Sequence, residues 1–407
     1  MSRFSIGARL SVMMFLQFFV WGAWYVTIGN YMIAHGMGDL THWPYTVNPL
    51  AAIVSPFFLG LVADRFFSTE RVLGVLHLLG GIAMLLVPQA TGNPTLFIGL
   101  LLLHNLCYMP TIGLANSLSF HNIQDQEKQF PLIRVFGTLG WIAAGLFISF
   151  VLGAFSGSVQ PNETALPIYT AGFAGIVVGL YSFSLPHTPP HAAGQKVSLR
   201  SILGLDALKT LGSRSFYVFV ASSLLICIPL AAYYNFSPIL VKEIGIANVE
   251  ATLSLGQISE VVFMLLMPLF FRRLGVKWML MVGMGAWVLR YALFALAIPG
   301  SVFWMIVGGI LLHGICYDFF FVTGYIYMDK KSTPAIRGQA QGLFVLLTNG
   351  VGMLIGAQIA GNLFTALGGA DMTASQWQTF WYIPAAFAGA ILLFFALAFR
   401  DRVDTES

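Results

Sequence analysis

The stretch that decides the fold is residues 11–33, SVMMFLQFFVWGAWYVTIGNYMI, in which no Asp, Glu, Lys or Arg interrupts the apolar side chains. An α-helix needs about 20 such residues to cross a bilayer's hydrocarbon core, which is about 30 Å thick. Backbone groups inside lipid must be hydrogen-bonded within the protein, and a long unbroken run achieves this as a helix, whereas barrel strands are short and alternating. Residues 11–33 therefore predict a membrane-spanning helix.

The rest of the chain repeats this pattern. Of its 407 residues, 57% are hydrophobic and 9% are charged, which is far from the composition of soluble domains. The predicted spans are residues 11–33, 45–63, 72–90, 95–120, 133–152, 166–185, 216–240, 252–271, 278–298, 301–327, 340–366 and 377–399. We therefore expect an all-α membrane protein with twelve transmembrane helices.

The distribution of Lys and Arg gives the orientation of these spans. If the N-terminus is cytoplasmic, 18 of the 20 Lys and Arg residues fall on the cytoplasmic side, whereas Lys242 lies opposite and Arg290 lies inside a span. Loops rich in Lys and Arg stay cytoplasmic, so this bias predicts that both termini are cytoplasmic. The net charge of +4 thus reflects membrane topology and does not indicate nucleic-acid binding.

The longest polar interval separates six predicted spans from six. It follows Pro186 and carries Pro189 and Pro190 near its start. We predict an N-terminal six-helix bundle at residues 1–186, a cytoplasmic linker at 187–212, a C-terminal six-helix bundle at 213–400 and a cytoplasmic tail at 401–407. Two bundles joined in this way are typical of transporters that rock one half against the other.

A short motif lies between the second and third predicted spans. Gly60, Asp64 and Arg65 form a Gly-x-x-x-Asp-Arg pattern there. It resembles the signature of the major facilitator superfamily, in which the resemblance implies a structural latch at the cytoplasmic helix ends. The alternative is an ordinary positively charged loop. A basic counterpart in the second half is formed by Arg272, Arg273, Gly275 and Lys277.

Longer motifs within the spans identify a branch of that superfamily. They are LQFFVWGAW at 16–24, YMPTIGLAN at 108–116, IRVFGT at 133–138, QISE at 257–260, AWVLR at 286–290, YDFF at 317–320 and AQGLFVLLTN at 340–349. Together they resemble the bacterial nucleoside:proton symporters over nearly the whole chain. This resemblance implies a major facilitator fold and a nucleoside substrate.

Two acids lie well inside the predicted spans, Glu260 and Asp318. Intramembrane carboxylates are expensive and usually functional, and the loss of water favours their neutral form, so each can take up and release a proton. Gln257 lies three residues before Glu260 and so on the same helical face, where the two side chains can hydrogen-bond the hydroxyls of a ribose. The alternative for this pair is hydrogen bonding between helices.

A second candidate stripe lies in the N-terminal half. Arg134, Thr138 and Trp141 occupy positions i, i+4 and i+7, which places a cation, a hydroxyl and an aromatic ring on one helical face. In the resembling family the matching arginine, threonine and a smaller aromatic line the substrate cavity, which implies contact between this stripe and a nucleoside. Alternatively, Arg134 is only a positively charged residue at the cytoplasmic helix mouth.

The role of Asp318 has two readings. It can carry the proton or accept a substrate hydrogen bond, or it can pair with the intramembrane cation Arg290, for which a structural role is favoured over ligand binding. The neighbouring rings of Tyr317 and Phe321, and Tyr233 in an earlier span, are candidate substrate contacts, although most rings in such spans serve packing.

One span departs from the family pattern. Residues 228–231 are apolar where the resembling family has polar cavity residues, with Tyr233 and Asn235 nearby. This departure leaves the preference for a particular base open.

These observations favour secondary-active import of nucleosides with protons across the bacterial inner membrane. Close alternatives are a major facilitator transporter of a sugar, glycoside or nucleobase, and an uncoupled nucleoside facilitator. A non-transporting membrane sensor is a more distant one. No G-x-x-x-x-G-K-[ST], H-E-x-x-H or G-x-S-x-G pattern is present, and the three cysteines form no C-x-x-C pair, so we expect neither enzyme chemistry nor a cofactor or metal.

Overall fold

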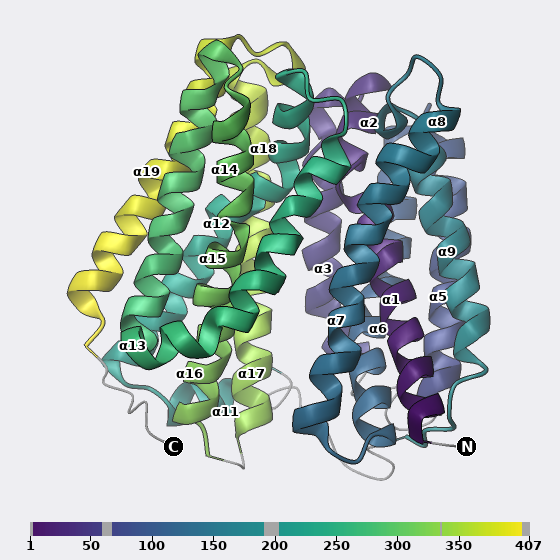
Figure 1. Cartoon of the computed structure of the whole chain (residues 1–407), viewed down its shortest axis with the longest axis vertical. Helices are drawn as coiled ribbons and strands as arrows, with labels where there is room; N and C mark the ends of the chain where they lie inside the picture. The colour runs from purple at the N-terminus through teal and green to yellow at the C-terminus, as the bar shows by residue number, and fades with distance from the viewer. Residues whose placement is uncertain (1–2, 59–66, 191–202, 334–335, 401–407) are drawn as a thin grey trace. The chain divides into compact units, whose positions relative to one another are not determined.

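The computed structural model describes residues 3–58, 67–190, 203–333 and 336–400 (Figure 1). Within these ranges every regular element is a helix. Contacts within the chain divide it into two compact units, unit 1 from Met1 to Val197 and unit 2 from Ser198 to Ser407. The division falls inside the predicted linker, whereas the predicted bundle boundaries at residues 186 and 213 remain a prediction.

Unit 1 is built from helices that pack side by side (Figure 1). They are α1 (Arg3–Tyr25), α2 (Ile28–Ala34), α3 (Trp43–Phe58), α5 (Thr69–Leu86), α6 (Pro94–Asn122), α7 (Gln126–Leu146) and α9 (Leu166–Ser182). Helices α6 and α7 begin at side-chain caps, since Asn93 accepts a hydrogen bond from the backbone N–H of Leu96 and Asp125 accepts one from that of Lys128. A π-helix at Phe147–Leu152 and the short α8 (Gly153–Phe155) continue α7.

Unit 2 is helical in the same way. Its elements are α11 (Leu205–Thr210), α12 (Arg214–Glu243), α13 (Val249–Ala297), α14 (Phe303–Leu311), α15 (His313–Tyr317), α16 (Thr323–Lys331), α17 (Arg337–Val345), α18 (Met353–Leu367) and α19 (Ala374–Ala398). A π-helix at Asp318–Val322 joins α15 to α16, and another at Leu346–Gly352 joins α17 to α18. Thr373 and Gln376 form a capping box at the start of α19.

Nine helical segments among the described residues are long and apolar enough to cross a membrane. One of them, Val249–Gly300, is 52 residues long and contains two helices. They meet at Gly275, whose φ of 65° lies in the left-handed region that glycine enters without steric cost. The shorter apolar helix Leu166–Ser182 is a further candidate. These segments agree with eleven of the predicted spans. The predicted span 45–63 is described only as far as Phe58 of α3 and is not among them, so the exact number of twelve remains a prediction.

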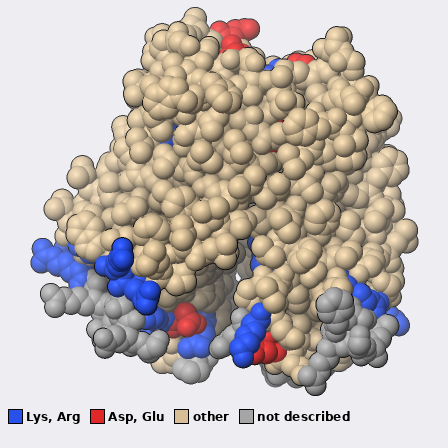
Figure 2. Space-filling model, viewed as in Figure 1, with Lys and Arg blue, Asp and Glu red and all other residues tan. Residues whose placement is uncertain are grey.

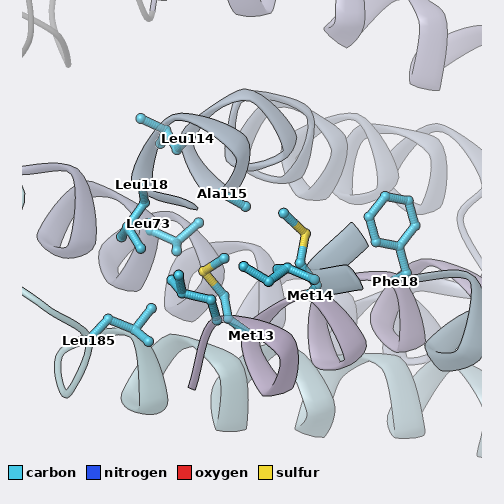
Figure 3. Packing of buried hydrophobic residues seen from close by; sticks show 10 residues of the cluster. Met13, Met14, Phe18, Leu73, Leu114, Ala115, Leu118 and Leu185 are labelled. Carbon is cyan, nitrogen blue, oxygen red and sulfur yellow. The ribbon is translucent and has the colours of Figure 1, made fainter. Parts of the chain in front are cut away.

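A core cluster of unit 1 beside α1 is made of aliphatic and sulfur-containing side chains together with the ring of Phe18 (Figure 3). Met13 and Met14 of α1 are fully buried, and they lie beside side chains from α5, α6 and the residues after α9. The labelled members of this cluster are Met13, Met14, Phe18, Leu73, Leu114, Ala115, Leu118 and Leu185. Flexible methionine side chains fill irregular gaps between helices of this kind.

Helices α5 and α9 approach closely through glycines. A methyl group on Gly81 of α5 would lie 2.9 Å from the carbonyl oxygen of Gly172 in α9, and one on Gly175 would lie 3.1 Å from the Cα atom of Gly81. Small residues let helix backbones approach within the membrane, where van der Waals packing drives association. This contact holds α5 and α9 together at short distance.

Charged side chains gather at one end of each unit. On the face shown in Figure 2, Lys and Arg lie mainly at the lower end, and the broad surface above them is almost free of charge. Exposed apolar residues on this kind of surface include Leu265 and Leu397, which are 77% and 76% exposed. An apolar belt beside a basic end is what a membrane-spanning bundle requires.

Candidate functional site

Asp318 is the most deeply buried acid of unit 2. It opens the π-helix Asp318–Val322, and none of its surface is exposed. Among the described residues, neither carboxyl oxygen of Asp318 has a hydrogen-bond partner. Buried polar atoms are normally paired, and π-helices occur frequently at functional sites. Asp318 is therefore available for a proton or for a ligand group.

Glu260 lies on α13 close enough to Asp318 for their charges to interact. Its side chain is 16% exposed, and its Oε2 atom is 3.8 Å from Nε2 of His313. Gln257, one turn before Glu260, is also half-buried. The structure thus brings both predicted intramembrane acids together inside unit 2, with an amide group on the helix that carries one of them.

Arg290 contacts an aromatic ring and a backbone carbonyl. It is fully buried on the second half of α13, its guanidinium carbon lies 4.1 Å from the centroid of the Tyr233 ring, and its Nε donates a hydrogen bond of 3.0 Å to the carbonyl oxygen of Gly309. Its two Nη atoms have no hydrogen-bond partner within the described part of the chain. The pairing of Arg290 with Asp318, left open by the sequence, is not formed here.

The three predicted ring contacts in unit 2 differ in exposure. Tyr317 is half-buried, and its ring centroid lies 5.0 Å from that of Phe321. Phe321 is almost fully buried and also packs edge-on against Trp287. Tyr233 is buried beneath Arg290. Of these three rings, Tyr317 is therefore the most accessible to a ligand, and the other two support the polar residues.

In unit 1 the predicted stripe on α7 packs toward α1. Arg134, Thr138 and Trp141 are all half-buried. The guanidinium carbon of Arg134 lies 4.3 Å from the Phe18 ring centroid, and the Trp141 ring lies 5.5 Å from that of Trp21 in an edge-on arrangement. The stripe therefore forms one wall of an aromatic cluster whose other wall belongs to α1.

A buried polar network lies next to this aromatic cluster. Gln17 of α1 donates a hydrogen bond of 2.7 Å to the hydroxyl of Thr111, and its side-chain oxygen lies 2.6 Å from Nε2 of His77. The hydroxyl of Tyr108 donates to the backbone carbonyl of Gln17 at 2.6 Å. The Tyr108 ring packs against Trp21 at 5.8 Å. These bonds fix α1 against α5 and α6 and so hold Trp21 in place.

The predicted latch residues Gly60, Asp64 and Arg65 lie outside the described residues. The basic counterpart of the predicted latch, Arg272, Arg273, Gly275 and Lys277, lies within the described residues. Nζ of Lys277 donates hydrogen bonds to the carbonyl oxygens of Ala396 at 3.1 Å and Phe399 at 2.8 Å. Lys277 therefore caps the C-terminal end of α19, where free carbonyl groups attract a cation.

Comparison with known proteins places this arrangement in a family. The family model described as "Nucleoside H⁺ symporter" matches residues 4–404. The chain belongs to the nucleoside H⁺ symporter family. It is 39% identical to the putative nucleoside transporter YegT of Escherichia coli over 402 residues, covering 97% of this chain and 94% of that protein. It is 31% identical to the nucleoside permease NupG of E. coli over 416 residues, covering 97% and 96%.

The fold of this nucleoside H⁺ symporter family member agrees with a solved relative. A crystal structure of the nucleoside transporter NupG superposes with a TM-score of 0.85 at 29% identity, covering 98% of this chain and 100% of that chain. The predicted all-α membrane-transporter fold of the major facilitator type is thereby confirmed. The chain is a transporter and not an enzyme.

Two residues of this nucleoside H⁺ symporter family member lie beside the site although the sequence analysis did not predict them as site residues. His313 lies 3.8 Å from Glu260, and the Trp21 ring packs against that of Trp141. Both contacts join helices that are far apart in the sequence, so helical periodicity within one span carries no signal for them.

Proposed function

We propose that this chain imports nucleosides together with protons by alternating access across the inner membrane of a bacterium. The observation that carries the proposal is the pair of intramembrane acids, Asp318 and Glu260, within a member of the nucleoside H⁺ symporter family. An uncoupled facilitator has no need of two costly carboxyl groups in its interior. A symporter needs at least one group that is protonated and deprotonated in each cycle.

We assign each part of the nucleoside to the residues whose side-chain chemistry suits it. Gln257 and Glu260 offer donors and acceptors for ribose hydroxyls, and Arg134 and Thr138 offer a cation and a hydroxyl for polar edges. Trp141 supplies a face on which a planar base can stack. Tyr317 adds a partly exposed ring in unit 2. Tyr233 and Phe321 support these groups from buried positions.

The proton is assigned to Glu260 or Asp318. Asp318 is fully buried and the Glu260 side chain is 16% exposed, and their charges repel each other when both are ionised. Holding at least one of them protonated lowers that repulsion. Proton entry from outside would then allow the substrate-bound protein to change access, and proton release inside would reset it.

The predicted topology completes the proposal. Both termini and the linker at residues 187–212 are assigned to the cytoplasm, and Gly60, Asp64 and Arg65 are assigned to a cytoplasmic latch. The exposed apolar surface is assigned to contact with the hydrocarbon core of the bilayer. No cofactor, metal or nucleic acid takes part in this scheme.

Uptake of labelled uridine and adenosine into proteoliposomes tests the function. An inward proton gradient is expected to drive accumulation in the wild type, and Glu260→Gln or Asp318→Asn is expected to abolish it. The matched control is Asp329→Asn, because Asp329 is a half-exposed acid at the end of α16 that pairs with Arg337. It should retain gradient-driven uptake.

The alternatives predict different results in the same assay. Nucleoside uptake that equilibrates without responding to the gradient would indicate an uncoupled facilitator. Absence of nucleoside uptake by folded wild-type protein would overturn the substrate, and competition with sugars, glycosides and free nucleobases would then identify the class. Ligand binding without turnover would indicate a sensor.

A further inference from the structure

The side chain of His313 lies between a buried cation and a candidate proton-carrying acid of unit 2. Its Nε2 atom is 3.8 Å from Oε2 of Glu260. Its ring stacks on Tyr233 with centroids 5.5 Å apart, and the guanidinium carbon of Arg290 lies 4.1 Å from the centroid of the same Tyr233 ring. Among the described residues, Nδ1 of His313 has no hydrogen-bond partner. The ring is fixed by stacking, and one of its nitrogens points at the acid.

The backbones around His313 hold this geometry tightly. A methyl group on Gly256 of α13 would lie 3.2 Å from Cβ of His313. One on Gly314 would lie 2.5 Å from the carbonyl oxygen of Ser259. The hydroxyl of Ser259 in turn donates a hydrogen bond to the carbonyl oxygen of Leu311. The helix that carries Glu260 and the one that carries His313 are therefore in direct backbone contact on both sides of the pair.

Arg290 makes a second positive charge on His313 unfavourable. Charges interact strongly in a low-dielectric interior, and the guanidinium of Arg290 lies over the same Tyr233 ring on which the imidazole stacks. The other titratable groups that face the pair are the hydroxyls of Tyr233, Tyr234 and Tyr317 and the carboxyl of Asp318. None of these brings a positive charge. A neutral imidazole with a hydrogen on Nε2 is the form that suits this position.

We propose that neutral His313 is a positioning residue for proton coupling, which donates its Nε2–H to the carboxylate of Glu260 whenever that acid has released its proton. The present separation of 3.8 Å between Nε2 of His313 and Oε2 of Glu260 exceeds hydrogen-bond length, so these two atoms do not form a hydrogen bond in this structure. A shift of about 1 Å would bring the two atoms to the usual length of a charge-assisted bond.

In this scheme the imidazole keeps its own hydrogen throughout the cycle. The transported proton binds to and leaves from Glu260 alone, and His313 only stabilises the ionised state between those two events. The inference rests on the proton-symport function proposed above, because an acid that never changed protonation would need no such donor.

Infrared titration of purified full-length protein in lipid nanodiscs tests the pair without any nucleoside. The carbonyl band of protonated Glu260 is assigned by its loss in Glu260→Gln. His313→Phe keeps a ring on Tyr233 but removes the donor, and it should move the band's titration midpoint to higher pH by about one unit or more. His313→Gln keeps a neutral N–H donor and should leave the midpoint within a few tenths of a unit. His77→Phe, which replaces a buried histidine of unit 1, is the matched control and should leave it unchanged.

Two results would overturn the proposal. An unchanged midpoint in His313→Phe would mean that the histidine only packs, and an equal shift in His313→Gln and His313→Phe would mean that titration of the imidazole itself is required. Where His313→Phe does not fold, His313→Leu takes its place. Uridine counterflow in the wild type tests the transport function separately, because exchange needs no proton gradient; a midpoint shift without counterflow would retain the pair and reject nucleoside transport.

Discussion

Glu70 and Thr188 are joined across the end of unit 1. Oε2 of Glu70, at the start of α5, accepts a hydrogen bond of 2.9 Å from the backbone N–H of Thr188, which follows α9. Oε1 lies 2.9 Å from Nδ1 of His187. The backbone N–H of Thr69 donates to the carbonyl oxygen of Thr188 at 2.9 Å, so the connection runs in both directions. The chain that leaves α9 is thereby anchored to the beginning of α5.

Removing this acceptor should destabilise unit 1. Glu70→Ala leaves the buried N–H of Thr188 without its partner, and we expect a loss of about 2 kcal/mol of unfolding free energy. Thermal unfolding of the purified protein in detergent measures the effect as a lowered Tm. Asp39→Asn, which changes an exposed acid of the same unit, should leave the Tm nearly unchanged. An equal decrease in both variants would show that the effect is one of net charge.

The glycine contact between α5 and α9 should not accept a methyl group. Gly81→Ala would place Cβ 2.9 Å from a backbone oxygen, which cannot rotate away, and we expect a loss of about 1–3 kcal/mol. The control is Gly99→Ala in α6, where no atom lies within 4 Å and alanine favours the helix. Unfolding by heat should separate the two variants. A Gly81→Ala protein as stable as wild type would mean that the two helices can move apart freely.

Arg290 should resist replacement by lysine. Lysine lacks the planar group that lies over Tyr233 and the Nε that bonds Gly309, so we expect Arg290→Lys to lose about 2 kcal/mol of stability. The matched control is Arg337→Lys, because Arg337 is half-exposed and its pair with Asp329 is of the kind that contributes little. Tm values of the two variants provide the comparison. If Arg290→Lys retained the wild-type Tm, a bare positive charge would be sufficient at this position.

Trp141 should matter for substrate affinity more than for folding. On the proposed function, Trp141→Ala removes a stacking face worth about 1–3 kcal/mol, so KM for adenosine should rise roughly tenfold or more. Trp141→Phe retains a ring and should stay within a few-fold of wild type. Trp304→Ala, which removes a tryptophan with 64% of its surface exposed, is the control and should not change KM. An unchanged KM in Trp141→Ala would remove this ring from the substrate site.

The spans were predictable because they depend on composition alone. The predicted segment 95–120 lies within α6, and 216–240 lies within α12, since an apolar run long enough for the bilayer leaves the backbone no alternative to a helix. The pairing of Gln257 with Glu260 on one face follows from periodicity in the same way.

The contacts of the polar residues were not predictable. The sequence left open a pairing of Arg290 with Asp318. In the structure Arg290 instead contacts the ring of Tyr233 and the carbonyl oxygen of Gly309, which belong to other helices. Lys277 was expected to belong to a latch, and it caps α19. Such contacts depend on how helices that are far apart in the sequence pack together, and this packing cannot be predicted from a single sequence.

The π-helix at Asp318–Val322 makes the length of this segment as important as its residues. A π-turn holds one more residue than an α-turn, so deleting a residue there would restore α-helical spacing and remove the widened turn in which Asp318 lies. A hybrid transporter that joins this chain to a relative should therefore be spliced outside residues 318–322, because one inserted or missing residue there would change the backbone around Asp318 although no side chain of the site had been mutated.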